Sequence, residues 1–192
     1  MAPVRELIAA ILKRGKASSP DFISIDGGDG GTGAAPMPLM DNMGLTIRES
    51  LPAMDDLLRE AGLRERIALN ASGKLLTPSE VAWAFCAGAD FVNSARGFMF
   101  ALGCIQALKC NKNTCPTGIT THDKRLQAGL NPENKSVRVA NYCKTLRKEV
   151  EMIAHSCGVD HPRELTRDHV MIVQENGRSQ PFSKVWDKSR YA

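Results

Sequence analysis

Phe22-Ile23-Ser24-Ile25 runs directly into Asp26-Gly27-Gly28-Asp29-Gly30-Gly31-Thr32-Gly33, and this stretch decides the fold class. The aromatic and β-branched residues predict a short buried strand. The eight residues that follow contain five glycines, so backbone N–H groups can turn toward a ligand without obstruction by a Cβ atom. Ligand sites of α/β sheets and barrels lie at the carboxyl ends of their strands. A flexible linker would have the same composition, so the loop alone is a weak signal.

The pattern of a strand followed by small residues recurs twice downstream. Residues 67–70 form a second predicted strand before Ser72-Gly73, and residues 91–94 a third before Ala95-Arg96-Gly97. Helices are predicted before and between these strands from apolar spacing, over residues 4–12, 47–63 and 77–88. The alternation of helices and strands predicts parallel strands joined by right-handed crossovers.

Local signals define several of these helices. Thr77, Pro78 and Glu80 combine an N-cap, a proline at the first helical position and a capping box. Beyond residue 120, apolar residues at spacings of four and three predict a long helix that Gly158 ends. The rest is predicted as a short helix over 160–165 capped by Asp160, a strand over 170–173 and an extended arm over 174–192.

Three strands are too few for a closed (β/α)8 barrel, which needs eight strands and about 250 residues. A small doubly wound α/β domain is the alternative, but the glycine placement favours the C-terminal portion of a TIM barrel. We therefore expect residues 1–120 to form a partial barrel domain with a cysteine loop at 103–118. Residues 121–192 are expected to form a helical extension and a C-terminal arm.

Composition narrows the class of protein. The 192 residues are 43% hydrophobic and 24% charged, with a net charge of +4 that is scattered along the chain. Nucleic-acid binding is therefore not expected. No apolar run approaches the roughly 20 residues that span a bilayer, and the N-terminus lacks the plan of a signal peptide. Six cysteines in a chain with ample apolar content indicate metal or redox chemistry in a reducing, cytoplasmic compartment rather than a disulfide framework.

Cys104, Cys110 and Cys115 have the spacing C-x5-C-x4-C, followed at once by Pro116. Soft thiolates bind iron well, and Cys-Pro also ends the bacterial ferredoxin motif. An iron–sulfur cluster with three cysteine ligands is the favoured interpretation. The alternatives are free structural cysteines, one disulfide with a spare thiol, and a zinc site completed by His122. The other cysteines, Cys86, Cys143 and Cys157, fall on apolar helix faces, where a core role is expected.

The loops after the last two strands predict a phosphate site. Barrels commonly bind phosphate there, through backbone N–H groups and a helix N-terminus. Ser72, Gly73, Ala95 and Arg96 are the candidate residues. Arg96 could supply charge to the ligand or could equally be solvated or ion-paired.

These motifs together resemble a known family. Asp29-Gly30-Gly31-Thr32-Gly33-Ala34, Ala101-Leu102-Gly103-Cys104, Cys110 and Asn113-Thr114-Cys115-Pro116-Thr117-Gly118 are similar to the FMN-binding central domain of glutamate synthase. The likeness is strongest to smaller stand-alone FMN-binding members of that family, and it extends over residues 2–186.

The resemblance implies a (β/α)8 barrel with FMN at its C-terminal face and a [3Fe–4S] cluster on Cys104, Cys110 and Cys115. It also implies reductive amination of 2-oxoglutarate to glutamate, with oxidoreductase chemistry of the CH–NH2 donor type. Gly30, Gly31 and Gly33 are expected near the flavin or substrate, whereas Ser72, Gly73, Ala95 and Arg96 are expected near its phosphate. No catalytic acid or base is assigned; Asp26 and Asp29 are candidates for which loop capping is the favoured role.

Two positions depart from the family pattern, because Gly28 stands where large members have histidine and Leu76 where they have lysine. Met1 aligns inside the helix between the fifth and sixth barrel strands, so five strands are expected to be missing. The exposed strand edge then favours association with a second chain, with the missing half of the barrel, or with further copies of this chain. A non-catalytic electron-transfer or zinc module, and a family flavoprotein with another substrate, are the alternative functions.

Overall fold

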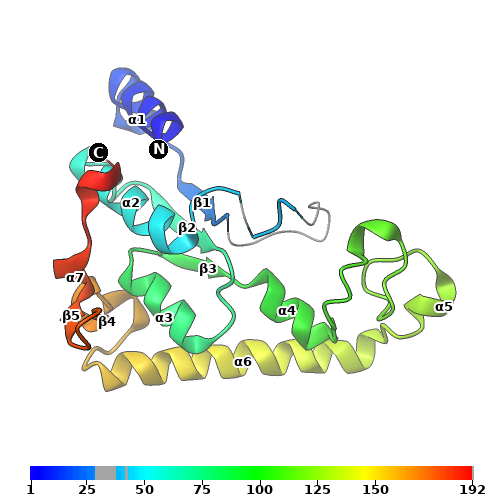
Figure 1. The fold of residues 1–192 in the computed structure, drawn as a ribbon. Helices are drawn as coiled ribbons and strands as arrows, with labels where there is room; N and C mark the ends of the chain where they lie inside the picture. The colour runs from blue at the N-terminus through cyan, green and yellow to red at the C-terminus, as the bar shows by residue number, and fades with distance from the viewer. Residues whose placement is uncertain (29–37, 42, 192) are drawn as a thin grey trace.

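The computed structural model describes residues 1–28, 38–41 and 43–191, and the described part has an α/β architecture (Figure 1). Three parallel strands form a sheet in the order β1-β2-β3. They span Phe22–Asp26, Ala68–Ser72 and Phe91–Asn93. The predicted strands and their parallel pairing are confirmed. Within the described residues this sheet is open, with β1 and β3 at its two edges.

Helices precede, separate and follow these strands. The N-terminal four are α1 (Ala2–Arg14), α2 (Ile47–Glu60), α3 (Pro78–Cys86) and α4 (Ala95–Leu102). The later ones are α5 (Lys124–Gln127), the long α6 (Pro132–Ser156) and α7 (Phe182–Val185). Short 3-10 segments span Lys16–Ser18, Cys110–Lys112, Pro162–Glu164, Arg167–His169 and Lys188–Tyr191. None of the described helices is both long enough and apolar enough to cross a bilayer.

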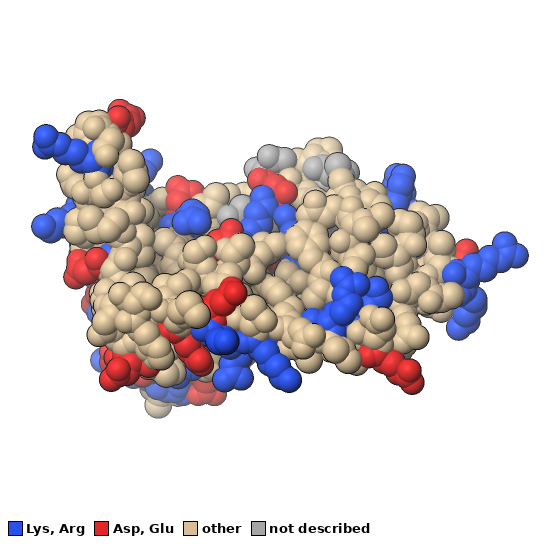
Figure 2. Space-filling view, turned by 90° about the horizontal axis from the view of Figure 1, so that it is seen from below, with Lys and Arg blue, Asp and Glu red and all other residues tan. Residues whose placement is uncertain are grey.

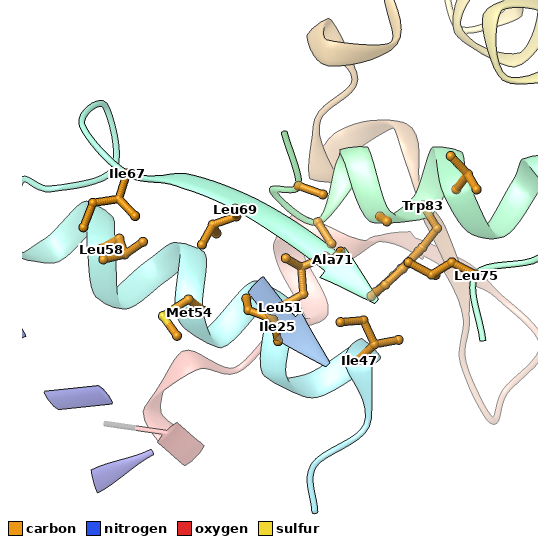
Figure 3. Packing of buried hydrophobic residues seen from close by; sticks show 14 of the residues in the cluster. Ile25, Ile47, Leu51, Met54, Leu58, Ile67, Leu69, Ala71, Leu75 and Trp83 are labelled. Carbon is orange, nitrogen blue, oxygen red and sulfur yellow. The ribbon is translucent and has the colours of Figure 1, made fainter. Parts of the chain in front are cut away.

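Among the described residues, helices cover one face of the sheet and leave the other open. Ile25 and Leu69 pack with Leu51 and Leu58 of α2 in the main core (Figure 3). Side chains alternate along a strand, so the intervening residues point to the opposite face. There Phe22 is 60% exposed. The expectation that β1 is a buried strand holds for Ile25 and in part for the half-buried Ile23. It is wrong for Phe22 and Ser24, because no described helix covers their face of the sheet.

The start of α3 matches its sequence signals. The Thr77 side chain accepts a hydrogen bond from the Glu80 backbone N–H at 3.4 Å. The Glu80 carboxylate accepts from the backbone N–H groups of Thr77 at 2.8 Å and Leu76 at 2.9 Å. Burial by itself raises the pKa of Glu80, but these hydrogen bonds outweigh it and lower the pKa below its usual value. The capping box is confirmed.

Replacing Thr77 with alanine is expected to lower the free energy of unfolding by about 1 kcal/mol, because one donor at the start of α3 loses its acceptor. Urea denaturation measures this loss. Thr77→Ser retains the hydroxyl and should be close to wild type. An alanine variant as stable as wild type would contradict the capping role.

The Glu80 carboxylate contributes to stability in a pH-dependent way, because folding lowers its pKa. Its contribution to the free energy of unfolding is fully present above the unfolded pKa and declines as the pH falls through the folded pKa.

The long helix α6 packs along α3 and α4 (Figure 1). Its predicted apolar seam is confirmed as far as Ile153. The helix begins at Pro132, where the Asn131 side chain caps it by accepting from the Asn134 backbone N–H at 3.2 Å. The Tyr142 hydroxyl donates to the Leu76 carbonyl at 2.8 Å and lies 2.9 Å from the Ser94 hydroxyl. This tyrosine thus fixes α6 to the loop after β2 and to the start of α4.

The C-terminal segment differs from its prediction. The short helix near residue 160 is a 3-10 turn capped by the His161 side chain rather than by Asp160. The predicted strand pairs as β4 (Met171–Val173) with an antiparallel partner, β5 (Ser179–Pro181). The arm beyond it is not extended, because Trp186 and Tyr191 anchor it to α2 through hydrogen bonds to Asp56 and Glu49.

Candidate functional site

The carboxyl ends of the three parallel strands meet at one edge of the sheet. Asp26 pairs with Ser72, and Ser72 pairs with Asn93, in the register of the sheet. These residues line a small pocket of about 90 Å³ together with Gly73, Lys74, Leu75, Leu76, Ser94, Ala95 and Arg96. The structure therefore brings together Ser72, Gly73, Ala95 and Arg96, and their contact with a phosphate stays a prediction. The predicted flavin contacts Gly30, Gly31 and Gly33 lie outside the described residues.

Two backbone hydrogen bonds hold the start of the loop after β1 in place, one to β2 and one to the segment before α2. The Gly27 N–H donates to the Ser72 carbonyl at 2.8 Å, and the Gly28 N–H donates to the Leu45 carbonyl at 2.7 Å. A Cβ atom at residue 28 would overlap the Met43 carbonyl oxygen. This close approach requires glycine at position 28.

Two cations converge beside this pocket. Lys74 follows β2, and its Nζ lies 3.3 Å from Oδ1 of Asp41. Arg96 follows β3, and its Nη2 lies 3.6 Å from the same oxygen. Of the two roles that the sequence left open for Arg96, the structure shows an ion pair. Sequence reasoning missed Lys74 and Asp41, because neither belongs to a motif and only the fold brings residue 41 to the strand ends.

The cysteine loop begins where α4 ends. Gly103, with φ of 102°, terminates the helix, and Cys104 follows. Three non-glycine residues of the loop also have positive φ, namely Gln106, Leu108 and Asn113. Such conformations are uncommon outside glycine and gather at functional sites. The loop therefore has unusual backbone conformations at three positions. These fit a segment that holds a ligand better than one that only connects two helices.

Cys115 has the most distinctive environment of the three loop cysteines. It is 8% exposed, and its Sγ lies 3.3 Å from the Thr117 hydroxyl. Burial by itself raises the pKa of this thiol, but hydrogen bonds from Thr117 and the Thr120 backbone outweigh it and lower the pKa to about 6. The thiolate is the form that binds metals. Cys115 is therefore suited to bind a metal ion as a thiolate.

All six cysteines have free thiols, so no disulfide joins any pair of them. Within the described ranges, no three His, Cys, Asp or Glu side chains are arranged as a metal site. His122, the fourth ligand of the zinc alternative, has its backbone N–H bonded to the Asn113 side chain at 2.6 Å. The assignment of Cys104, Cys110 and Cys115 to a cluster stays a prediction that rests on their donor chemistry and shared loop.

The other cysteines do not all have the expected core role. Cys86 is buried and Cys143 half-buried, but Cys157 is exposed at the end of α6. The helix seam reaches Ala154, which is fully buried, and then runs into solvent. The prediction that Cys157 lies in the core is therefore wrong. The apolar spacing of α6 continues one helical turn past the last residue that other elements cover.

The two environments predict different thiol reactivity. Burial, with a contribution from the nearby Cys157, raises the pKa of Cys86 to about 12. At pH 8 only about one Cys86 in ten thousand is then a thiolate, the reactive form. We expect iodoacetamide to alkylate Cys157 in the native protein and Cys86 only after unfolding, as peptide mass spectrometry would show. Equal rates of alkylation at Cys86 and Cys157 in the native protein would contradict the burial of Cys86.

The face of the molecule seen from below carries charges of both signs, with lysine and arginine side chains interspersed with acidic ones (Figure 2).

The conserved region of glutamate synthase matches residues 4–160. The glutamate synthase large subunit-like protein YerD of Bacillus subtilis is 47% identical over 174 residues, which cover 91% of this chain and 33% of that protein. The archaeal glutamate synthase [NADPH] of Methanocaldococcus jannaschii is 38% identical over 143 residues, covering 74% of this chain and 28% of that protein. The ferredoxin-dependent glutamate synthase of Pyropia yezoensis is 33% identical over 166 residues, covering 86% of this chain and 10% of that protein. The chain spans about a third or less of the length of these relatives.

Proposed function

Because this chain belongs to the glutamate synthase family, we propose that it is the part of a glutamate-synthase-type oxidoreductase that holds the FMN phosphate and a [3Fe–4S] cluster. The observation that carries the proposal is the position of α4. This helix begins at the carboxyl end of β3 with Arg96 in its first turn, and it ends beside Cys104. Its eight residues span about 12 Å, so one rigid element links the two cofactor regions.

The residues at the strand ends fit a phosphate. Gly73 and Ala95 leave the backbone accessible, and Lys74 and Arg96 supply positive charge beside the pocket. Anions also bind favourably at helix N-termini, and Ser94 makes no side-chain capping bond at the start of α4. A whole small molecule usually fills about 300 Å³ or more, so this pocket suits a phosphate, and the flavin ring requires walls from other residues.

The open sheet supports a partial barrel. The face opposite α2 has polar and exposed side chains, and the Asn70 Oδ1 atom there is buried without a hydrogen-bond partner among the described residues. Within the part of the chain that the structure describes, β1 and β3 each pair on one side only, and the outer edge of such a strand offers backbone groups for pairing. We infer that strands from another segment, a second chain or a further copy of this chain complete a (β/α)8 barrel and enclose this face.

Three free thiols on one specified loop fit an iron–sulfur cluster by their chemistry, since soft thiolates are its usual ligands. In this proposal Cys104, Cys110 and Cys115 hold the cluster. When bound, FMN would supply hydride transfer and the cluster would supply single electrons. The overall reaction would be the conversion of 2-oxoglutarate and ammonia to glutamate. This chain's own residues bind and orient the phosphate and fix the cluster loop at the end of α4. The departures at Gly28 and Leu76 favour, as a second candidate, a family flavoprotein with another substrate.

The visible absorption spectrum of anaerobically purified protein tests the proposal. We expect the broad bands of an iron–sulfur cluster, and flavin bands when FMN is added together with the segment that completes the barrel. Metal analysis should find iron and acid-labile sulfide. A colourless protein containing zinc would refute the cluster and support the structural zinc alternative. Flavin bands with no activity toward 2-oxoglutarate would support another substrate.

A further inference from the structure

We propose that Lys74 and Arg96 form a phosphate-binding site that the Asp41 carboxylate occupies until a phosphate group displaces it. This inference deepens the proposed function, on which it rests, because that function places the FMN phosphate at the same strand ends. It adds to that function an internal competitor for the phosphate, the Asp41 carboxylate.

The geometry is that of a two-cation site filled by one anion. The Lys74 and Arg96 side chains come from the loops after neighbouring strands, and both approach a single oxygen, Oδ1 of Asp41, at 3.3 and 3.6 Å. All three side chains keep about a third of their surface exposed. A ligand in solution can therefore reach the cations and replace the carboxylate without opening the core.

Stability alone does not explain this cluster. Exposed ion pairs contribute roughly 0–1 kcal/mol. Lys74 and Asp41 both have left-handed backbone, with φ of 49° and 66°, and such conformations cost of order 1 kcal/mol or more for a non-glycine residue. The ion pairs therefore stabilise the protein by no more than the left-handed conformations of Lys74 and Asp41 destabilise it. Strained residues of this kind are typical of binding sites.

The start of α4 provides a second reason to expect an anion. Arg96 lies in the first turn, where the helix dipole disfavours positive charge, and that turn contains no acidic residue. The Ser94 hydroxyl is hydrogen-bonded to Tyr142 and does not cap the helix. An anion held between Arg96 and the helix N-terminus would relieve this unfavourable arrangement.

A phosphate monoester should outcompete Asp41 for these cations. It carries a charge of about −1.5 to −2 near neutral pH, compared with −1 for a carboxylate. It can also accept two parallel hydrogen bonds from one guanidinium group. Because Asp41 is held by weak, exposed contacts, the exchange needs only a modest difference in affinity.

Equilibrium dialysis of the full chain with radiolabelled inorganic phosphate, at fixed ionic strength, tests the exchange. We expect Asp41→Asn to bind phosphate about fivefold more tightly than wild type, which corresponds to losing a competitor worth about 1 kcal/mol. Lys74→Gln should bind about fivefold more weakly or worse. Lys188→Gln, which removes a surface lysine paired with Glu60, is the matched control and should bind as wild type does.

Unchanged or weaker binding by Asp41→Asn would overturn the inference, as would unchanged binding by Lys74→Gln or no binding by any variant. Inorganic phosphate involves neither flavin nor iron, so the two proposals can fail separately. A tighter Asp41→Asn variant of a protein that never takes up flavin or iron would uphold the phosphate site and refute the proposed function. Flavin and cluster bands with no effect at Asp41 would refute only the exchange.

Discussion

Replacing Asp55 with alanine is expected to lower the free energy of unfolding by about 2–3 kcal/mol, because its buried carboxylate accepts charged hydrogen bonds from three arginines. Asp55 is 2% exposed. Its carboxylate binds Arg59 at 2.9 Å, Arg64 at 2.8 Å and Arg167 at 2.9 Å. This one side chain therefore connects α2 to the loop before β2 and to the C-terminal segment.

Two of the arginines keep other partners, which limits the loss. Arg167 also binds Asp56 at 2.9 Å. Arg64 also binds Asp90 and the Gly88 carbonyl, each at 2.8 Å. A Cβ atom at Gly88 would lie 2.6 Å from Cγ of Asp55, so the backbone approaches the carboxylate closely. Removing the carboxylate leaves a cavity and removes charged hydrogen bonds, and both effects lower the stability.

Urea denaturation followed by circular dichroism measures the effect of Asp55→Ala. The matched control is Asp21→Ala, which removes the partner of Arg66 in an ion pair of similar length, 2.7 Å. The Asp21 side chain is 86% exposed, so its loss should cost less than about 1 kcal/mol. Equal shifts of the two denaturation midpoints would show that the buried network does not contribute as expected.

Replacing Cys115 with serine is expected to abolish the iron–sulfur absorption of the anaerobically purified protein. Serine keeps the size of the side chain but replaces a soft thiolate with a hard hydroxyl that binds iron poorly. The iron content should fall from about three atoms per chain, the number in a [3Fe–4S] cluster, to a small fraction of that. Iron analysis and the visible spectrum give two independent measurements.

Cys157→Ser is the control for Cys115→Ser. It also removes one thiol, but from the exposed end of α6 outside the loop. This variant should keep its iron and its colour. Far-ultraviolet circular dichroism must show that Cys115→Ser is folded, because Cys115 is buried. A folded serine variant with full iron content would remove Cys115 from the ligand set and leave the spacing motif without its proposed role.

The sequence predicted well those elements whose cause is local. Thr77 and Glu80 lie three residues apart, so the capping box can be recognised before any fold is known. The apolar seam of α6 follows from helix periodicity. Its start at Pro132 was missed although Asn131 and Pro132 form a local cap signal, because the apolar spacing begins only several residues later.

Elements that depend on distant contacts were predicted poorly. The arm beyond residue 174 has no periodicity, and its conformation depends on Trp186 and Tyr191 reaching α2 across more than a hundred residues. The exposed Cys157 shows the converse, because periodicity indicates an apolar face but not where the covering surface ends. Gly97 looked like one more loop glycine, yet it is buried, and a Cβ atom there would collide with the Tyr142 hydroxyl.

By itself the sequence determined the parallel strands, the residues at their carboxyl ends and the three thiols of one loop, because residue type and short-range spacing govern these features. Only the tertiary structure decided which face of the sheet is covered, how Asp55 joins three segments, and that Asp41 lies between Lys74 and Arg96. The physical reason is that burial and charge pairing depend on distances between residues far apart in the chain. Asp41 belongs to no motif, and it reaches the cations only because the parallel sheet brings the ends of its strands to one edge.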